Sequence, residues 1–169
     1  MQQYWPFFLP LRGAAHNQIP HHKNLSAVLI GIYHDLKIKG AASDIIQAIT
    51  LPEAINGWWT KKCTGRLGLG ESYNFYFSED YDWYATVVEY IPEKKVAFDM
   101  TICSPDWMGT RFSFEILEEL PQGRLVRFEH VGWRAVTDHF RVSSYCWVSY
   151  LNNLKRLVEQ GVRTSYQEK

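Results

Sequence analysis

The sequence predicts an α+β fold in which many antiparallel strands pack against one long C-terminal helix. Near the C-terminus, apolar residues recur at spacings of four, three and four residues and form a stripe on one helical face: Trp147, Leu151, Leu154 and Val158. Before this stripe, short segments alternate between apolar and polar residues and are separated by turn residues, which is typical of half-buried strands. One long helix and many such strands fit only a few α+β layouts.

The first predicted strand begins at Val28 and ends before Gly40. Its apolar face alternates with mostly charged residues, so one side should be buried and the other solvated. The residues of the buried side are Ile32, His34, Leu36 and Ile38.

Two short helices are predicted after this strand. Ser43 can cap the first, because its hydroxyl can accept an unpaired backbone N–H. Thr50 stands three residues before Glu53, with Pro52 at an early helical position. This is the pattern of a capping box, and it predicts a second helix that runs to Gly57.

Six more strands are expected between these helices and the long helix. Glycines at positions 65, 68 and 70 lie between two strand-like runs and predict a hairpin; a phosphate-binding loop is disfavoured because no helix follows. Alternation continues in later segments, with turn residues at 78–80, 92–94, 104–106 and 121–123. The apolar faces include Tyr73, Phe75, Phe77, Val96, Phe98, Met100, Phe112, Phe114, Ile116, Val126, Phe128 and His130.

The last helix is expected within residues 135–161. Thr137 and Asp138 can accept unpaired N–H groups at its start, and Gly161 marks its end. About 25 residues at roughly 1.5 Å each give a rod of about 38 Å, long enough to span a small domain.

Length and charge favour one globular domain without a nucleic-acid partner. The chain has 169 residues, and Lys plus Arg equals Asp plus Glu at 18 each, so no net field attracts polyanions. We expect an extended leader at residues 1–27, the domain at 28–163 and a C-terminal tail at 164–169. The apolar stretch at residues 1–11 contains Pro6 and Pro10 and is too short to span a bilayer. A cytoplasmic protein without a membrane span is therefore expected.

No metal or cofactor is predicted. The three cysteines, Cys63, Cys103 and Cys146, are far apart and lack the spacing of metal ligands, so they should be reduced thiols. The histidines at positions 16, 21 and 22 have no carboxylate or thiol near them in the sequence, and a solvated leader explains them better.

Three segments resemble the Hsp90-ATPase-activator-homologue-like family, which belongs to the START/Bet v 1-like helix-grip superfamily. They are Pro52-Glu-Ala-Ile-Asn-Gly-Trp-Trp59, Glu129-His-Val-Gly-Trp133 and the W-x3-L-x2-L pattern that begins at Trp147. The resemblance covers roughly residues 28–161. It implies a curved seven-stranded antiparallel sheet wrapped around the long helix, with a hydrophobic cavity between them that opens near the short helices and hairpin loops. The family includes ligand-binding proteins, stress-response proteins and enzymes such as cyclases.

The leading hypothesis is a protein that binds a small hydrophobic ligand, lipid-like or aromatic, in this cavity. His130 lies on an apolar strand face, so it is either a hydrogen-bonded core residue or the polar anchor of a ligand, and His34 is open to the same two interpretations. Aromatic residues make up 15% of the chain and serve either a core or a cavity wall. The candidate ligand-binding residues are His34, Trp58, Phe75, Phe98, Phe112, Phe114, Phe128, His130 and Trp133.

Two other functions remain open: a stress-response module that interacts with a chaperone, and a cyclase- or hydrolase-type enzyme that uses the same cavity. An enzyme is disfavoured, because no Ser or Cys comes with the His and Asp spacing of a nucleophile, and no catalytic residue is assigned. The acid-base residues considered are Glu89, Asp106, Arg111, Glu129 and His130. The sequence names neither the ligand nor the oligomeric state.

Overall fold

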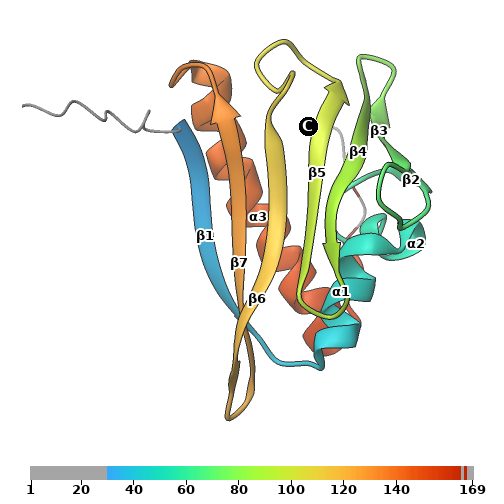
Figure 1. Cartoon of the computed structure of the whole chain (residues 1–169), viewed down its shortest axis with the longest axis vertical. Helices are drawn as coiled ribbons and strands as arrows, with labels where there is room; N and C mark the ends of the chain where they lie inside the picture. Colours follow the sequence, from blue (N-terminus) through green and yellow to red (C-terminus); the bar gives the residue numbers. More distant parts are fainter. Residues whose placement is uncertain (1–29, 165, 167–169) are drawn as a thin grey trace, which may run out of the picture.

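The computed structural model of the protein describes residues 30–164 and residue 166. The predicted leader at residues 1–27 and the predicted strand start at Val28 lie outside the described residues, as do residues 165 and 167–169 of the predicted tail. The described part contains one seven-stranded antiparallel sheet, two short helices after the first strand and one long C-terminal helix (Figure 1). The predicted helix-grip α+β fold is confirmed.

The seven strands lie side by side in the order β1-β7-β6-β5-β4-β3-β2, and every neighbouring pair is antiparallel. Their bounds are β1 (Ile30–Ile38), β2 (Lys62–Gly65), β3 (Ser72–Ser78), β4 (Tyr81–Ile91), β5 (Lys95–Ile102), β6 (Arg111–Leu120) and β7 (Gly123–Trp133). The helices are α1 (Ala42–Thr50), α2 (Pro52–Ile55) and α3 (Asp138–Gln160). In Figure 1, α3 crosses behind the sheet, and α1 and α2 lie toward the β2 side.

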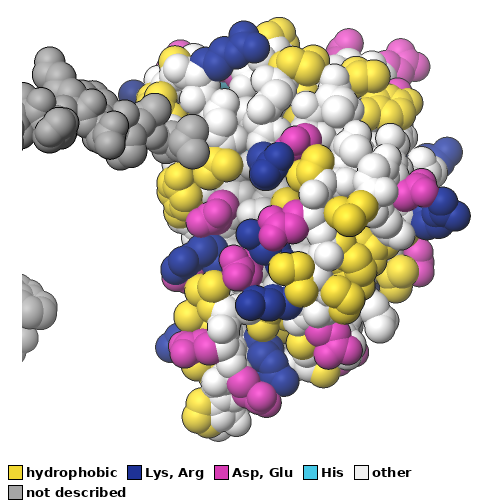
Figure 2. Space-filling model, viewed as in Figure 1, with side chains coloured by type: hydrophobic (Ala, Val, Ile, Leu, Met, Phe, Trp, Pro, Cys, Tyr) yellow, Lys and Arg dark blue, Asp and Glu magenta, His cyan; other side chains and the backbone are white. Residues whose placement is uncertain are grey.

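The outer face of the sheet carries charges that compensate one another. Asp35 on β1 accepts two hydrogen bonds from Arg127 on β7, at 2.9 and 3.0 Å. Arg127 is the register partner of Glu115, which is the partner of Lys95, and the Lys95 ammonium lies 3.0 Å from Glu89. Figure 2 shows both signs of charge mixed on this face. The outer face therefore presents no large patch of one sign.

The short helices start differently from the prediction. Ala41, not Ser43, is the N-cap of α1, and Leu51 is the N-cap of α2, with no side-chain capping bond at either. Thr50 still belongs to the last turn of α1, so its hydroxyl donates to the carbonyl of Ile46 at 2.7 Å and is not available to α2. The predicted caps at Ser43 and Thr50 are therefore wrong, although both helices exist.

The long helix is held at both ends as its sequence predicts. The Thr137 hydroxyl accepts the N–H of Phe140, and Gly161 ends the helix in the left-handed conformation with φ of 68°. Four side chains along the inner side of α3 are buried: Ser143, Trp147, Leu151 and Leu154. Val158 continues this stripe as a partly exposed residue that packs next to Gly40.

A β-bulge near the end of β7 returns Trp133 to the inner face. Ile32 pairs with His130 and Ile30 pairs with Trp133, so β7 has one more residue than β1 over this step. Gly132 adopts a φ of 88°, which favours glycine. Strand alternation would place Trp133, three positions after His130, on the opposite face from His130; the extra residue places both side chains on the inner face.

Within the described residues, no helix is long and apolar enough to cross a membrane, and no three His, Cys, Asp or Glu side chains are grouped to hold a metal ion. The three cysteines are free thiols. Burial, together with the charge of Glu53, raises the pKa of Cys63 to about 12, and burial raises the pKa of Cys103 to about 11. These two thiols are therefore poor nucleophiles at neutral pH.

Candidate functional site

The centre of the space between the sheet and α3 is filled by aromatic rings. The five phenylalanines predicted to line a cavity are all at most 1% exposed: Phe75, Phe98, Phe112, Phe114 and Phe128. They contact one another and three tryptophans; Phe98 stacks on Phe112 at 4.9 Å, and Phe128 lies 4.4 Å from Trp147. These rings therefore act on one another as a packed core.

Trp59 lies at the centre of this core, although the sequence analysis selected its neighbour Trp58. The Trp59 ring is 4.7 Å from Phe75, 5.4 Å from Phe112 and 5.0 Å from Trp147. Trp58 instead packs edge-on against Phe114 at 6.1 Å. The two tryptophans stand in a turn without periodicity, so no sequence pattern distinguishes their directions.

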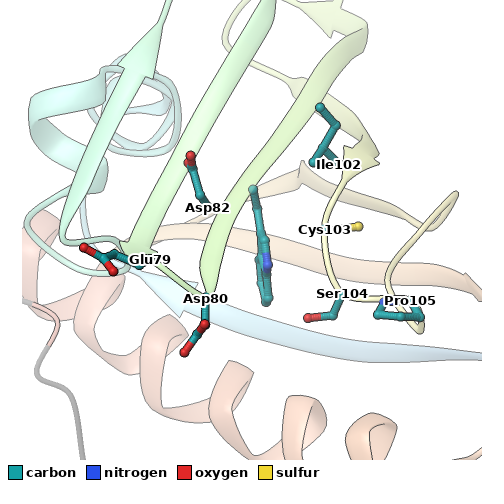
Figure 3. Close-up of a pocket in the computed structure, with 8 residues that line it drawn as sticks. Glu79, Asp80, Asp82, Ile102, Cys103, Ser104 and Pro105 are labelled. Carbon is teal, nitrogen blue, oxygen red and sulfur yellow. The ribbon is translucent and has the colours of Figure 1, made fainter.

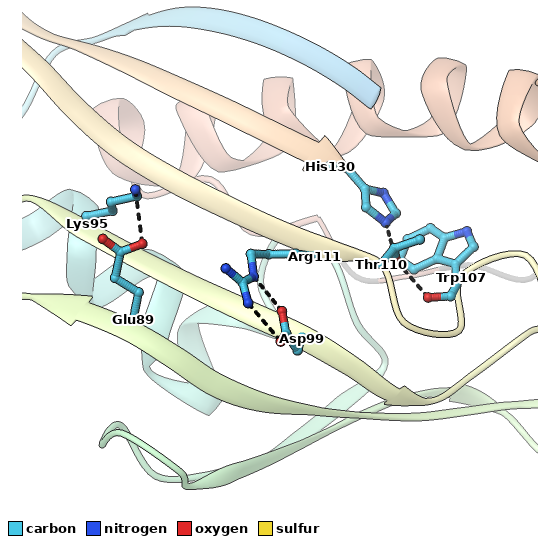
Figure 4. A network of polar contacts seen from close by, with 7 residues as sticks. All are labelled: Glu89, Lys95, Asp99, Trp107, Thr110, Arg111 and His130. Carbon is cyan, nitrogen blue, oxygen red and sulfur yellow. Dashed lines mark hydrogen bonds and ion pairs between the residues drawn. The ribbon is translucent and has the colours of Figure 1, made fainter. Parts of the chain in front are cut away.

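His130 is fully buried, and both of its ring nitrogens have partners within the protein. The Trp147 indole N–H donates to Nδ1 at 3.0 Å, which places the imidazole proton on Nε2. Nε2 then donates to the Thr110 hydroxyl at 2.8 Å, and this hydroxyl donates to the carbonyl of Trp107 at 2.7 Å (Figure 4). The four residues form a directed chain of hydrogen bonds that leaves no His130 nitrogen for a ligand.

Burial keeps His130 neutral. It lowers the pKa of the imidazole to about 3, and nearby His139 contributes a smaller part. The same network reaches α3, because the indole N–H of Trp107 donates to the Ser143 hydroxyl at 3.1 Å. Neither Thr110 nor Ser143 is among the site residues predicted from the sequence; the only sequence signal for Ser143 is its place four residues before Trp147 on the inner side of α3.

Two buried nitrogens on the β1 and β7 side have no hydrogen-bond partner among the described residues: Nε2 of His34 and Nε1 of Trp133. Trp133 is 4% exposed and packs edge-on against Phe140 of α3 at 5.1 Å. The His34 ring stacks on Phe128 at 6.4 Å, and burial lowers the pKa of His34. Unpaired buried polar atoms are rare in folded proteins, so this side of the inner face differs from the centre.

The same side is partly open to solvent. We call it the seam and define it by Ile30, His34 and Leu36 on β1 and Phe140 and Val158 on α3, all of which are partly exposed. β1 is an edge strand, and α3 packs along it. The seam therefore lies beside the two residues that carry the unpaired nitrogens, at the edge of the packed core.

The side near the short helices is covered by the end of the chain. The N–H of Thr164 donates to the carbonyl of Gly57 at 2.7 Å, and Arg163 donates to the carbonyl of Glu53. Tyr166 packs against Phe77 of β3 at 5.1 Å. The family resemblance implies an opening near these helices, but in this chain residues 163, 164 and 166 occupy that region.

A depression of about 370 Å³ lies at one end of the sheet, between the β3–β4 turn and the C-terminal end of β5. It is lined by Glu79, Asp80, Asp82, Trp83, Ile102, Cys103, Ser104 and Pro105. Figure 3 shows the three carboxylates pointing in different directions. They do not converge on a common point, which a metal ion or a single cationic group would require.

The acid-base residues considered from the sequence do not gather around His130. Arg111 donates two hydrogen bonds to the carboxylate of Asp99, one from Nε and one from Nη2 at 2.9 Å. This pair lies on the outer face of the sheet, away from His130 (Figure 4). Glu89 pairs with Lys95 on the same outer face. Asp106 accepts a hydrogen bond from Thr137 at 2.6 Å. Among the described residues, no carboxylate is hydrogen-bonded to His130, so the site lacks an acid-base pair.

Comparison with known proteins agrees with this architecture. Residues 41–159 match the family model described as Activator of Hsp90 ATPase homolog 1-like protein. The solution structure of the Aha1 dimer from Colwellia psychrerythraea is 31% identical, with a TM-score of 0.72 over 78% of this chain and 98% of that chain.

Two crystal structures share the fold at lower identity. A Mesorhizobium loti protein is 17% identical, with a TM-score of 0.68 over 78% of this chain and 98% of its own. A Staphylococcus saprophyticus protein is 19% identical, with a TM-score of 0.65 over 80% and 96%. No curated protein sequence matches the chain significantly.

Proposed function

The chain belongs to the Activator of Hsp90 ATPase homolog 1-like family, and we propose that it binds a small, mainly apolar molecule at the seam between β1 and α3. The observation that carries the proposal is the pair of unpaired buried nitrogens, on His34 and Trp133, beside partly exposed apolar side chains. Binding sites for small molecules combine an apolar lining with a few polar groups that fix orientation. The seam has this composition, whereas the packed core has its polar atoms already paired.

A thermal-shift screen tests this proposal. The panel contains fatty acids, sterols, flavonoids and polycyclic aromatics, and we expect at least one stabiliser, because a ligand at 100 times its Kd adds about 2.7 kcal/mol to the free energy of unfolding. The variant Leu36→Gln should weaken this stabilisation. The matched control is Leu69→Gln, since Leu69 is 68% exposed in the β2–β3 hairpin and distant along the sheet from β1. The proposal fails if no compound stabilises the protein.

We also infer a second candidate function, interaction with an Hsp90-type chaperone. It is favoured by the description of the family and by the 31% identical relative, which is described as an Aha1 protein. The test is the ATPase rate of an Hsp90-type chaperone with increasing amounts of this chain, with a thermally unfolded sample as control. A rate increase of at least twofold supports the interaction, and an unchanged rate without detectable binding rejects it.

The same relative is described as a dimer, and we infer that a second copy covers the solvent side of α3. Three apolar side chains lie there at a spacing of three residues: Val142, Tyr145 and Val148, which are 58%, 72% and 44% exposed. Sedimentation velocity of the wild type and of Tyr145→Lys tests this assembly. We expect a dimer that the charge shifts toward the monomer; a wild type that is monomeric at 100 μM contradicts it.

A further inference from the structure

We propose that the molecule bound at the seam carries a neutral hydrogen-bond acceptor, such as a ketone, ester or ether oxygen, which binds the indole N–H of Trp133. This inference rests on the proposed function and names the chemical class of ligand for the same site. It goes beyond apolar complementarity, because it assigns a partner to one atom of the protein.

The Trp133 nitrogen requires an acceptor. An indole N–H can only donate, and a buried donor is almost always paired in a folded protein. Three other buried indoles follow this rule: Trp58 donates to the carbonyl of Ala48, Trp107 to Ser143 and Trp147 to His130. Trp133 is 4% exposed and has no acceptor among the described residues. The missing partner must therefore come from outside the described side chains.

The acceptor should be uncharged. No Lys, Arg, Asp or Glu side chain is buried among the described residues, and the buried polar side chains are hydroxyls of Ser and Thr and the imidazole of His130. An ionised head group would lose its hydration there without a counter-charge. A neutral oxygen would gain the Trp133 hydrogen bond at a much smaller desolvation cost.

We expect Phe140 to control access to this nitrogen. It lies in the first turn of α3, is partly exposed, and packs edge-on against the Trp133 ring. Rotation of a partly exposed side chain is fast compared with unfolding, so we expect that rotation of Phe140 exposes part of the Trp133 ring while the contact of this ring with His130, at 4.8 Å, persists. Phe140→Ala should therefore leave the acceptor preference intact and raise affinity for larger probes.

Two probes of the same shape test the proposal: 4-phenyl-2-butanone, which has a ketone oxygen, and butylbenzene, which has a methylene group at that position. Dissociation constants are measured by NMR titration of the full chain, together with the indole N–H resonances. Relative to partition into an apolar solvent, we expect the ketone to bind roughly 3- to 10-fold more tightly than the hydrocarbon, which corresponds to one hydrogen bond. The Trp133 N–H resonance should shift with the ketone only.

Trp133→Phe removes the N–H and should abolish the preference while butylbenzene still binds. Trp58→Phe is the matched control, since it removes an indole N–H outside the seam and should keep the preference. Equal binding of both probes by the wild type, or a preference that survives in Trp133→Phe, overturns the inference but leaves the proposed function standing. If neither probe binds to the wild type or to Phe140→Ala, the inference fails, and the compound screen then decides the proposed function independently.

Discussion

The two halves of the inner face of the sheet contain similar residues but differ in the burial of their side chains and in the pairing of their polar atoms. In the half formed by β3 to β6, the middle of β7 and the centre of α3, aromatic rings contact one another and both ring nitrogens of His130 are paired. In the half formed by β1 and the end of β7, His34 and Trp133 have buried nitrogens without partners among the described residues, next to partly exposed apolar side chains. Both halves contain a histidine on the apolar face of a strand. Burial and pairing, not residue type, decide which one is structural.

From this difference we expect stability to depend mainly on the centre, and it is at the edge that we propose binding. A paired, fully buried network tolerates little change, because removing one member leaves another buried group unsatisfied. An edge strand with partly exposed neighbours can admit a ligand without loss of that network.

Trp147→Ala should be the most destabilising change. Trp147 is 1% exposed, heads the inner stripe of α3, packs at 4.4 Å from Phe128 and donates to His130. Truncation of a core aromatic typically costs about 3–5 kcal/mol, and the unpaired Nδ1 of His130 adds to it. Denaturant melts of both proteins measure the loss. A loss below about 1 kcal/mol would mean that the centre is not the stabilising half.

Acid should destabilise the centre through His130. Its pKa is about 3 in the folded protein and close to 6.5 when unfolded, so between these values the unfolded chain binds a proton that the folded chain excludes. Stability is therefore fully present above pH 6.5 and falls as the pH drops toward 3, by up to an amount on the order of 5 kcal/mol. Urea melts from pH 7 to pH 4 test this.

His130→Gln should flatten the pH dependence while lowering stability at pH 7. His139→Gln is the control, because His139 is partly exposed and lies outside the hydrogen-bonded chain, and it should retain most of the wild-type slope. Equal slopes in the wild type and in His130→Gln would show that other groups govern the acid response.

Thr110→Val should lower the free energy of unfolding by roughly 1–3 kcal/mol. The valine keeps the size of the side chain but leaves His130 Nε2 without its acceptor, whereas the carbonyl of Trp107 loses one of its two donors and keeps the backbone N–H of residue 110. Thr101→Val is a matched control. The Thr101 side chain is exposed, and its hydroxyl donates to the carbonyl of Tyr84 at 3.1 Å. This substitution should change the free energy of unfolding by less than about 0.5 kcal/mol. A similar cost for both variants would contradict a special role of the buried network.

The sequence predicts the elements of this fold because each has its own local signal. Alternation marks the strands, the stripe from Trp147 marks α3, and Thr137 and Gly161 set its ends. The caps of the short helices were predicted wrongly because Thr50 has two competing uses, as a cap for α2 and as a donor within α1, and the tertiary position of α1 decides between them.

The pairing of polar atoms in the site could not be predicted. Thr110 reaches His130 because it directly precedes β6, on which Phe112 pairs with His130, and Trp133 faces inward because of the bulge at Gly132. Neither feature has a period in the sequence. Strand alternation places His34 and His130 on the inner face, but only contacts between distant segments show which of their nitrogens are paired.

Deleting residues 1–25 should leave a cooperative unfolding transition, with a change in stability below about 1 kcal/mol. The predicted domain begins at Val28, and the deleted segment has no periodic apolar face. A urea melt of the shortened chain, compared with the full chain, measures the change. Loss of the cooperative transition would move the domain boundary toward the N-terminus and change the description of the seam, because β1 begins at Ile30.

The smallest effect is expected from Trp133→Phe, and its comparison with Trp58→Phe measures the difference between the halves directly. Both substitutions shorten a buried ring and remove one N–H. The indole N–H of Trp58 donates a hydrogen bond to the carbonyl of Ala48. In a helix this carbonyl would accept the backbone N–H four residues later, but that residue is Pro52, which has no N–H. Trp58→Phe therefore leaves a buried carbonyl unpaired, whereas Trp133→Phe removes a donor that had no partner among the described residues.

Without ligand, Trp58→Phe should lower the free energy of unfolding by roughly 1–3 kcal/mol more than Trp133→Phe in parallel urea melts. Equal losses would indicate that the Trp133 N–H is satisfied in solution, for example by a trapped water molecule, and that the seam is as well paired as the centre.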